Sequence, residues 1–459
     1  MQEKEPVVGP GLLLALQRRG AATLHEQLEQ ALRDQVRGDR LAPGTRLPSS
    51  RALAAELGIS RGVVLEAYAQ LTAEGYLTAS QGAPTRVALM PSGERERPPV
   101  AATSLGAGHR HDFDPGIPDL VAFPRQDWLR SLRTAAREAP FGSLGYGDPR
   151  GAPELRNALM AYLGRARGAA PEPEHTIVCG GFTQGFAVLC RALRMRGIER
   201  IAVEAPGFGP HRLIAESAGL ERVEIPVDEH GISVDELSAS GCEVVVVTPA
   251  HQFPTGVVLS AERRTALLEW AEDEDGLVVE DDYDSELRYD RDAVGALQGL
   301  APERIAHIGS VSKRLAPGLR LGWVLAPSWL SGALTYEKAL ADGGTQALEQ
   351  LALADLIERG DLDRHLRRMR LRYRARREAL LAALARELPA ATAGGVAAGL
   401  FVQITLPVVD ERALAAAGVG VHVIADGDQT RSRLALGFGN LSERAIADGV
   451  RAIAGAACG

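Results

Sequence analysis

From Phe113 onward, the chain alternates short apolar runs with longer stretches that have helical periodicity. The runs are Thr176–Val178, Ile201–Val203, Val244–Val247, Leu277–Glu280, Ile305–Ile308 and Trp323–Leu325. Short apolar strands separated by helices indicate an α/β domain with a largely parallel sheet between helical layers. In such sheets, ligands bind at the carboxyl ends of the strands. We therefore expect the functional residues of this region directly after the apolar runs.

One lysine lies in a polar turn after the run at 305–308. The chain's only lysines are Lys4, Lys313 and Lys338, and the rest of its basic charge is arginine. Unlike arginine, lysine can lose its proton and condense with an aldehyde. The hydroxyls of Ser310 and Ser312 and the guanidinium of Arg320 are groups that bind a phosphate dianion. The stretch 310–323 therefore predicts a pyridoxal phosphate (PLP) site, and a surface lysine in a polar loop is the alternative.

Other polar residues also follow predicted strands. Gly180-Gly181-Phe182-Thr183 opens a helix, where backbone amides and the helix dipole favour an anion. Asp281-Asp282-Tyr283 offers a carboxylate for a pyridine nitrogen and a phenol for a ring hydroxyl. Phe208 offers a plane that can stack on the ring. A plain turn, an acidic loop and a core aromatic are the corresponding structural alternatives.

The N-terminal part of the chain has the pattern of a compact helical module. Apolar residues recur every four positions from Leu24 to Arg37, which predicts a first helix. Ser50 offers a cap for a second helix at 51–57, and Ser60 caps a third. The segment 76–87 predicts two short strands, a wing. A helix-turn-helix followed by a wing is typical of DNA-binding modules.

The charge of this module does not by itself identify its partner. Arginines and acidic residues are equal in number between residues 24 and 86, so attraction to phosphate depends on placement. Arg51, Ser60 and Arg61 lie at the starts of two helices, where backbone amides add to the attraction. A small helical module that binds protein is the alternative.

Three stretches of the module resemble the winged helix-turn-helix of the GntR family of bacterial transcription regulators. They are Leu47-Pro-Ser-Ser-Arg-Ala-Leu-Ala54, Leu57-Gly-Ile-Ser-Arg61 and Glu66-Ala-Tyr…Leu71…Glu74-Gly-Tyr-Leu77. The resemblance implies that Arg51, Ser60, Arg61 and Gly62 meet DNA, and that Gln81 and Gly82 of the wing reach the minor groove. The wing departs from the family's common ending, because it reads Gly82-Ala-Pro-Thr-Arg-Val87.

The length and composition of the chain indicate how many domains it can form and where they meet. With 459 residues, 46% of them apolar, the chain has room for two or three domains. Residues 89–111 are rich in Pro, Gly, Ala and charge and predict a flexible linker. We expect a DNA-binding domain at 15–88 and an effector domain at 112–459. No apolar run approaches the ~20 residues that a membrane span needs, so we expect a cytoplasmic protein.

Stretches of the larger domain resemble fold-type I aminotransferases, and in particular the MocR subfamily of GntR regulators, in which such a domain follows the winged helix. They include Ser143-Leu-Gly-Tyr-Gly-Asp-Pro-Arg-Gly151, Glu204-Ala-Pro-Gly-Phe208, Thr248-Pro-Ala-His-Gln-Phe-Pro-Thr-Gly256, Val279-Glu-Asp-Asp-Tyr283 and Ser310-Val-Ser-Lys313. The resemblance implies the PLP-dependent transferase fold, with a large α/β domain and a smaller C-terminal α+β lobe.

The resemblance also implies a role for each candidate residue. Lys313 would form the Schiff base with PLP, Asp281 would pair with the pyridine nitrogen, Tyr283 would bind the ring hydroxyl, and Phe208 would stack on the ring. The phosphate would be held by Gly181, Phe182, Thr183, Ser310, Ser312 and Arg320. Tyr146 would reach across from the partner subunit of a homodimer.

Two departures from the enzymes of this fold bear on the ligand. Phe253 stands where they usually have an asparagine that helps to hold the ring hydroxyl. Ala435 stands where they usually have the arginine that binds the substrate carboxylate. Arg433, two residues earlier, would lie on the same face of a strand and is the candidate substitute.

We therefore expect a PLP-dependent transcription regulator. It would be a homodimer that binds repeated half-sites in operator DNA and senses PLP, or an amine or amino-acid ligand, with no metal. A regulator rather than an enzyme is expected. The alternative is an active aminotransferase with an attached DNA-binding module, because Asp281 and Lys313 suffice for imine chemistry.

Overall fold

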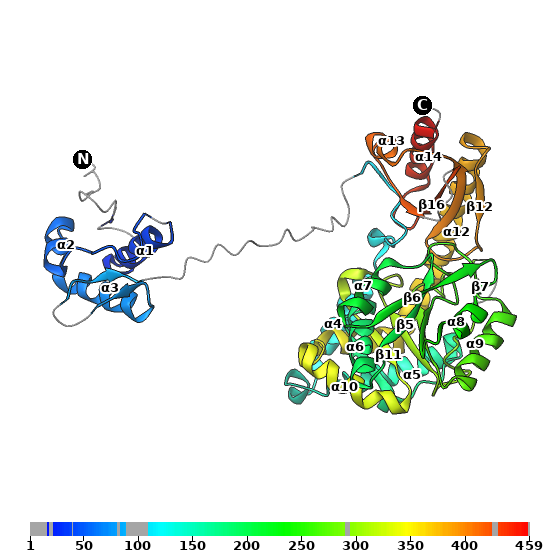
Figure 1. The fold of residues 1–459 in the computed structure, drawn as a ribbon, viewed down its shortest axis with the longest axis horizontal. Helices are drawn as coiled ribbons and strands as arrows, with labels where there is room; N and C mark the ends of the chain where they lie inside the picture. The colour runs from blue at the N-terminus through cyan, green and yellow to red at the C-terminus, as the bar shows by residue number, and fades with distance from the viewer. Residues whose placement is uncertain are drawn as a thin grey trace. The chain divides into compact units, whose positions relative to one another are not determined.

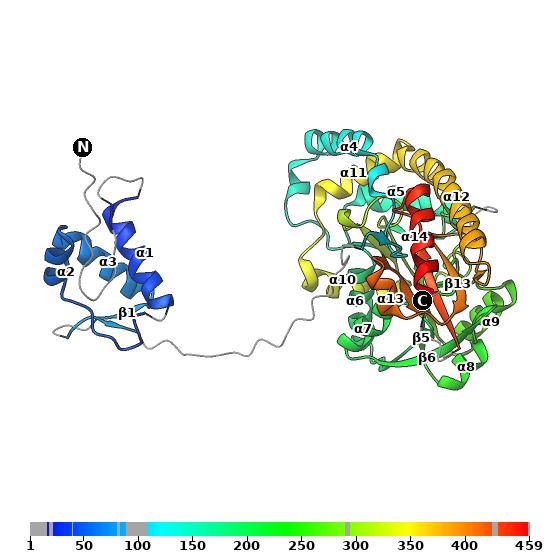
Figure 2. The same cartoon turned by 90° about the horizontal axis from the view of Figure 1, so that it is seen from above.

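The computed structural model describes residues 16–17, 22–38, 40–79, 83–88, 109–289, 294–424 and 430–457. Its internal contacts divide the chain into two compact units (Figures 1 and 2), an N-terminal unit, Met1–Thr103, and a C-terminal unit, Ser104–Gly459. Of the linker predicted at 89–111, only His109–His111 are among the described residues. Gln81 and Gly82 lie outside them.

The N-terminal unit consists of three helices and a short antiparallel hairpin. They are α1 (Leu24–Arg37), α2 (Ser50–Leu57), α3 (Arg61–Ala73), β1 (Leu77–Thr78) and β2 (Arg86–Val87). Leu28, Leu53, Val64 and Leu71 are among the side chains that form its core. Ser60 caps α3 as expected. Ser49, not Ser50, caps α2, so this helix begins one residue earlier than predicted.

The C-terminal unit is built around an eight-stranded sheet in the order β4-β11-β10-β9-β8-β5-β6-β7. Its strands are β4 (Thr176–Cys179), β5 (Arg200–Ala205), β6 (Glu221–Asp228), β7 (Gly231–Ile232), β8 (Val244–Val247), β9 (Leu277–Asp282), β10 (Ile305–Ser310) and β11 (Gly322–Leu325). Neighbours from β10 to β6 pair in parallel, whereas β11 runs antiparallel to both β10 and β4. The predicted, largely parallel sheet is confirmed, with β11 as the exception among the predicted runs.

Helices cover both faces of this sheet (Figure 1). They are α4 (Arg125–Glu138), α5 (Pro153–Arg167), α6 (Phe182–Met195), α7 (Gly209–Ser217), α8 (Val234–Ser240), α9 (Ala261–Asp273), α10 (Ser328–Asp342) and α11 (Ala347–Glu358). Val244 and Val246 of β8 face a core with α6 and α10, while Val245 and Val247 face another with α8 and α9. This alternation explains the continuous apolar run at 244–247, because a strand buried on both faces has no polar side.

A smaller lobe follows the long helix α12 (Asp361–Glu387), which packs on α11 and on α14 (Glu443–Ala457). The lobe has the sheet order β12-β13-β16-β15. Its elements are β12 (Thr392–Gly394), β13 (Phe401–Pro407), α13 (Glu411–Ala416), β14 (Val419–Gly420), β15 (His422–Ile424) and β16 (Arg431–Gly437). β3 (His111–Asp112) pairs with β14, so the start of the unit joins the lobe.

Short 3-10 helices complete the unit. They are η1 (Leu120–Ala122), η2 (Phe141–Leu144), η3 (Pro173–His175) and η4 (Pro317–Leu319). Because β4, β5, β8, β9 and β10 all run in one direction, their carboxyl ends meet at one edge of the sheet. The segments at Gly180, Pro206, Thr248, Tyr283 and Val311 therefore leave the sheet at the same edge.

Candidate functional site

Lys313 lies in the turn that follows β10, and its Nζ donates a hydrogen bond to the backbone carbonyl of Gly116. Burial lowers the pKa of its amine, although the carboxylates of Asp114, Asp284 and Asp281 oppose the shift. A lowered pKa increases the neutral fraction of an amine at a given pH, and the neutral form is the nucleophile. The surroundings of Lys313 thus favour reaction with a carbonyl.

Asp281 faces His211 at the edge of the sheet. It is the fifth residue of β9, which runs two residues further than the predicted strand. Its Oδ2 lies 3.0 Å from Nε2 of His211 in α7. Burial raises the pKa of the Asp281 carboxyl, although His211 opposes the shift. In this environment, the Asp281 carboxylate is suited to accept a hydrogen bond from a positively charged donor.

Tyr283 follows the end of β9 and bonds to the segment after β8. Its hydroxyl donates to the backbone carbonyl of His251 at 2.7 Å and lies 3.3 Å from Nδ1 of the same residue. That nitrogen lies 2.9 Å from Oδ2 of Asp284. Burial, together with nearby carboxylates, raises the pKa of the Tyr283 phenol well above its ordinary value. Tyr283 is therefore a hydrogen-bond donor at neutral pH.

Gly181 and Arg320 come together at the N-terminus of α6. Gly181 has φ 86°, and a Cβ there would lie 3.2 Å from guanidinium nitrogens of Arg320. Arg320 donates to the carbonyl of Gly180. A Cβ at Gly322 would lie 2.8 Å from both the Gly181 Cα and the Gly309 carbonyl oxygen, so the turns touch through backbone. We call this group the anion cradle: Gly180, Gly181, Phe182, Thr183, Ser310, Ser312 and Arg320.

The chemistry of the anion cradle follows from these positions. The first amides of α6 have no partner within the helix and point toward its N-terminus. The guanidinium of Arg320 adds a fork of donors beside them. Ser310 Oγ accepts a 3.4 Å hydrogen bond from the Ser312 amide, so the two serines share one turn. The arrangement can bind a phosphate group.

Phe208 stands at the start of α7 and is surrounded by other rings. Its centroid lies 5.3 Å from that of His211, 5.7 Å from that of Phe253 and 6.4 Å from that of Phe182, each in an edge contact. The side chain is 36% exposed. Because Phe208 is partly exposed, its ring can meet another planar group.

A buried ion network, absent from the sequence expectations, underlies Lys313 and Asp281. Arg314 pairs with Asp282 at 3.4 Å and with Glu286, and Arg167 pairs with Asp282 at 3.1 Å. Burial alone would raise the pKa of Asp282, but Arg167, His307 and Arg314 together hold it well below its usual range. The network therefore joins the residue after Lys313 to the residue after Asp281.

Two predicted residues lie apart from this group. Tyr146 is fully exposed in the single chain. Arg433 lies in β16 opposite Thr405 of β13 and Ile424 of β15. It is two residues from Ala435, on the same face of the strand. Four parts of the site were not predicted from the sequence: His211, His251, Asp114 and the buried ion network.

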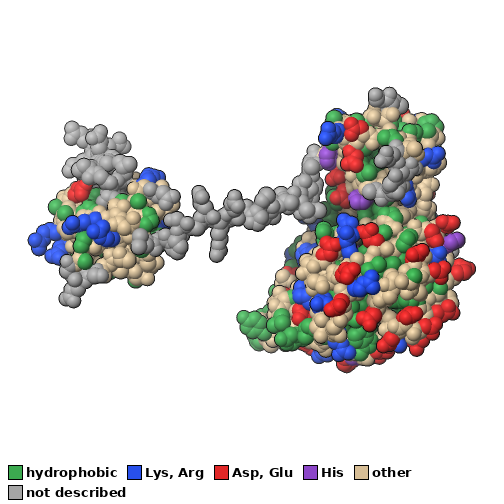
Figure 3. All heavy atoms as spheres, viewed as in Figure 1, with side chains coloured by type: hydrophobic (Ala, Val, Ile, Leu, Met, Phe, Trp, Pro, Cys, Tyr) green, Lys and Arg blue, Asp and Glu red, His purple; other side chains and the backbone are tan. Residues whose placement is uncertain are grey.

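The N-terminal unit has a basic surface (Figure 3). Arg46, Arg51, Arg61 and Arg86 are exposed, and among the described residues no carboxylate lies within ion-pair distance of them. Arg61 Nε donates to Ser50 Oγ at 3.3 Å, which links the start of α3 to α2. By contrast, Arg33 forms an ion pair of 2.8 Å with Glu74. Although arginines and acidic residues are equal in number between residues 24 and 86, the four exposed arginines therefore give this surface a local excess of positive charge.

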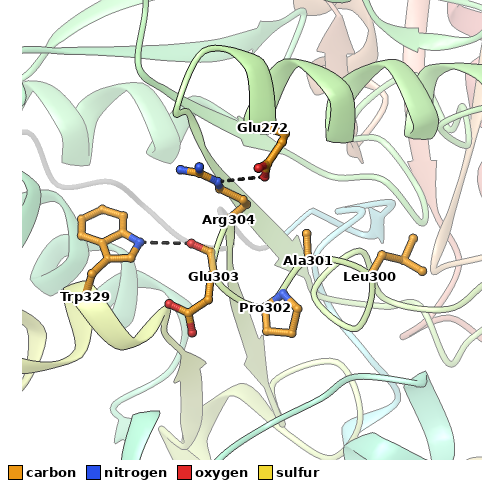
Figure 4. Close-up of a pocket in the computed structure, with 7 residues that line it drawn as sticks. All are labelled: Glu272, Leu300, Ala301, Pro302, Glu303, Arg304 and Trp329. Atoms are coloured by element: carbon orange, nitrogen blue, oxygen red, sulfur yellow. Dashed lines mark hydrogen bonds and ion pairs between the residues drawn. The ribbon is translucent and has the colours of Figure 1, made fainter.

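A separate hollow of about 570 Å³ lies near the start of β10 and holds none of the predicted residues (Figure 4). Arg304 pairs there with Glu272 at 3.3 Å, and Trp329 Nε1 donates to the Glu303 carbonyl at 3.1 Å.

In the described part of the chain, no cluster of three or more His, Cys, Asp or Glu residues is arranged to hold a metal ion. None of the described helices is both long and apolar enough to cross a membrane.

Two family patterns match the chain. The family described as "Bacterial regulatory proteins, gntR family" matches residues 24–87, and "Aminotransferase class I and II" matches residues 123–436. The chain therefore combines a GntR helix-turn-helix domain with an aminotransferase-like domain.

The chain is also similar to named regulators and to a solved aminotransferase. The pyridoxine biosynthesis regulator PdxR of Corynebacterium glutamicum is 35% identical, covering 80% of each chain. The probable rhizopine catabolism regulator MocR of Rhizobium meliloti is 34% identical, covering 82% of this chain and 80% of its own. The multiple substrate aminotransferase of Thermococcus profundus has a similar structure, with a TM-score of 0.70 and 27% identity over 77% of this chain and 92% of its own. The chain belongs to the MocR subfamily of GntR transcription regulators.

Proposed function

We propose that this protein is a homodimeric regulator that binds PLP in its C-terminal unit and operator DNA through its N-terminal unit. The observation that carries the proposal is the convergence of the anion cradle, the buried Asp281 and the amine of Lys313 at one edge of one sheet. As a DNA-binding regulator, it would act in the cytoplasm. PLP itself, or an amine or amino acid that reacts with it, would be the signal.

The residues present fit each end of PLP. Gly181 has no side chain, and a Cβ there would crowd Arg320, so the helix N-terminus stays open to a phosphate. Asp281, held by His211, is suited to the pyridine nitrogen, and Tyr283 is suited to the ring hydroxyl. PLP, when bound, supplies an aldehyde with which a lysine amine condenses. Phe208 would stack on the ring.

A homodimer is supported by exposed apolar side chains in and directly after η2. Phe141, Leu144 and Tyr146 are all strongly exposed in the single chain. Large apolar side chains gathered on a surface typically mark an interaction site. We assign this surface to a second copy of the chain, with Tyr146 reaching the partner's PLP. Paired N-terminal units would then bind repeated half-sites.

DNA binding is assigned to the starts of α2 and α3. Arg51, Ser60, Arg61 and Gly62 are exposed there, and the helix dipole adds to the basic charge. Gln81 and Gly82 of the wing remain proposed minor-groove contacts. The GntR family match over residues 24–87 supports this assignment.

The test is operator binding with and without PLP. Duplexes selected from a random pool by the full-length protein would be titrated with PLP-loaded protein, PLP-free protein and the Lys313→Ala variant. We expect PLP to change the affinity of the wild type and not that of the variant. Equal affinity of the wild type in both states would contradict the proposed PLP dependence.

The alternative function, an active aminotransferase, is favoured by the presence of both Lys313 and Asp281. Incubation with amino donors and an α-keto acid distinguishes it. Turnover of ~1 s⁻¹ or more would show an ordinary enzyme. We expect at most a single half-reaction, because Phe253, in place of the usual asparagine, has no hydrogen bond to offer the ring hydroxyl.

A further inference from the structure

Phe253, in the segment after β8, forms an aromatic wall with two rings of the small lobe beside the candidate PLP site. Phe253 lies 5.7 Å from Phe208, 5.4 Å from Phe401 and 5.0 Å from His422, measured between ring centroids. Ala435 is fully buried in the same apolar cluster as Phe401 and Ile424. We call Phe253, Phe401, His422 and Ala435 the distal wall.

The distal wall is electrically neutral. Burial lowers the pKa of His422, although Asp114 opposes the shift, so this imidazole is uncharged at neutral pH. Phe253, Phe401 and Ala435 carry no charge. An aromatic surface favours apolar groups and, through the ring faces, cations. Its one side-chain hydrogen-bond donor is the N–H of the neutral His422 ring, so the wall offers a carboxylate no positive charge.

Two carboxylates lie beside this wall. Asp284 bonds to His251, whose ring stacks on Phe401, and Asp114 lies near His422. A Cβ at Gly116 would lie 3.0 Å from Asp114 Oδ1 and 3.4 Å from the Nζ of Lys313. A Cβ at Gly437, two residues after Ala435, would lie 2.1 Å from the Asp114 carbonyl oxygen. Asp114 therefore stands between Lys313 and the end of β16. A ligand attached near the Lys313 amine meets a negative charge there.

Arg433 is the arginine of β16 that lies closest in sequence to Ala435, and it occupies a register position further along the strand. Arg433 opposes Thr405 of β13, whereas Ala435 opposes Gln403. Each step of two residues along a strand is about 6.7 Å.

We infer that the amine recognised by this site is a primary amine without an α-carboxylate, such as an aryl-alkyl amine or a linear diamine. This inference rests on the proposed function, since it concerns the ligand of the same PLP site. Asp114 and the distal wall are its specificity determinants. An α-amino acid would bring its carboxylate beside Asp114 and against rings that carry no positive charge.

The physical reason is the cost of like charges and of unpaired buried ions. Bringing like charges together in an interface disfavours binding. A carboxylate removed from water without a partner adds to that cost. We therefore expect each carboxylate-free amine to bind more tightly than its amino acid by on the order of tenfold or more.

The experiment compares pairs that differ only by the carboxylate. The PLP-loaded full-length protein is titrated with phenethylamine and phenylalanine, and with 1,4-diaminobutane and ornithine. The absorbance of bound PLP reports the reaction, and titration calorimetry reports binding independently. We expect both amines to bind and both amino acids to bind at least about tenfold more weakly.

Asp114→Asn is the diagnostic variant, and Asp127→Asn, on the surface of α4, is its control. We expect Asp114→Asn to narrow the preference for amines over amino acids, and Asp127→Asn to leave it unchanged. Equal or tighter binding of the amino acids to the wild type overturns the inference, and loss of that binding in Arg433→Ala would identify the carboxylate partner. Bound PLP with no response to any of the four ligands also overturns it. Failure to bind PLP overturns the proposed function and the inference together.

Discussion

Replacement of Arg314 by methionine tests the buried ion network. Arg314 is 1% exposed, pairs with Asp282 and Glu286, and lies 5.3 Å from the ring centroid of Trp323. Methionine fills much of the same volume but leaves Glu286 buried without its cation. Removing one partner of a buried ion pair costs about 3–5 kcal/mol. We expect a loss of stability of this size in the C-terminal unit.

Arg165→Met is the matched control. Arg165 pairs with Asp363 at 2.7 Å, but its side chain is 62% exposed. Exposed ion pairs contribute about 0–1 kcal/mol. The two variants make the same chemical change to an ion-paired arginine, so their difference isolates the effect of burial.

Calorimetry of the full-length variants provides the measurement. An unfolding entropy of ~2 cal/mol/K per residue over roughly 350 residues makes 1 kcal/mol equivalent to ~1.4 °C. We therefore expect the Tm of the C-terminal unit to fall by ~4–7 °C in Arg314→Met and by ~1 °C or less in Arg165→Met. Equal shifts in the two variants would refute the assigned role of the network.

Three further results are expected. Arg61→Met should weaken operator binding and lower the slope of log affinity against log salt by about 1. Arg33→Met should change binding less, because Glu74 already neutralises Arg33. Equal effects of the two variants in a fluorescence-anisotropy titration would contradict this expectation. Because the pKa of Lys313 is lowered in the folded state, the unfolded state binds more protons between that pKa and ~10.4. The free energy of unfolding of PLP-free protein therefore rises with pH through this window. In chemical denaturation, Lys313→Met should weaken that rise. Ser60→Ala should destabilise the N-terminal unit by ~1 kcal/mol through loss of the α3 cap, and an unchanged denaturation midpoint would exclude that role.

Sequence periodicity predicted the large sheet because its strands are buried on both faces and read as apolar runs. The direction of β11 was not predictable, since the run 323–325 looks the same in either direction. The extension of β9 through Asp281 and Asp282 was hidden for a different reason. Two acidic residues disfavour a buried strand, and Asp282 is tolerated there because Arg167 and Arg314, distant in sequence, neutralise it.

The candidate site was predictable where chemistry and local structure coincide, as at Lys313 and at Gly181 before α6. His211 had a usable signal, because it follows Phe208 by three residues and a helix brings such positions to one side. Asp114 had none. Its position depends on backbone contact between the start of the unit and Gly437, more than 300 residues away.

The visible absorption spectrum of the purified protein tests the central claim most directly. PLP would be added to the wild type and to Lys313→Ala, and the mixtures would be reduced with borohydride and mapped by mass spectrometry. With only three lysines in the chain, attachment can be assigned without ambiguity. The account predicts a PLP band in the wild type that the variant lacks, with the label on Lys313. No band at excess PLP, or a label on Lys4 or Lys338 instead, would contradict it.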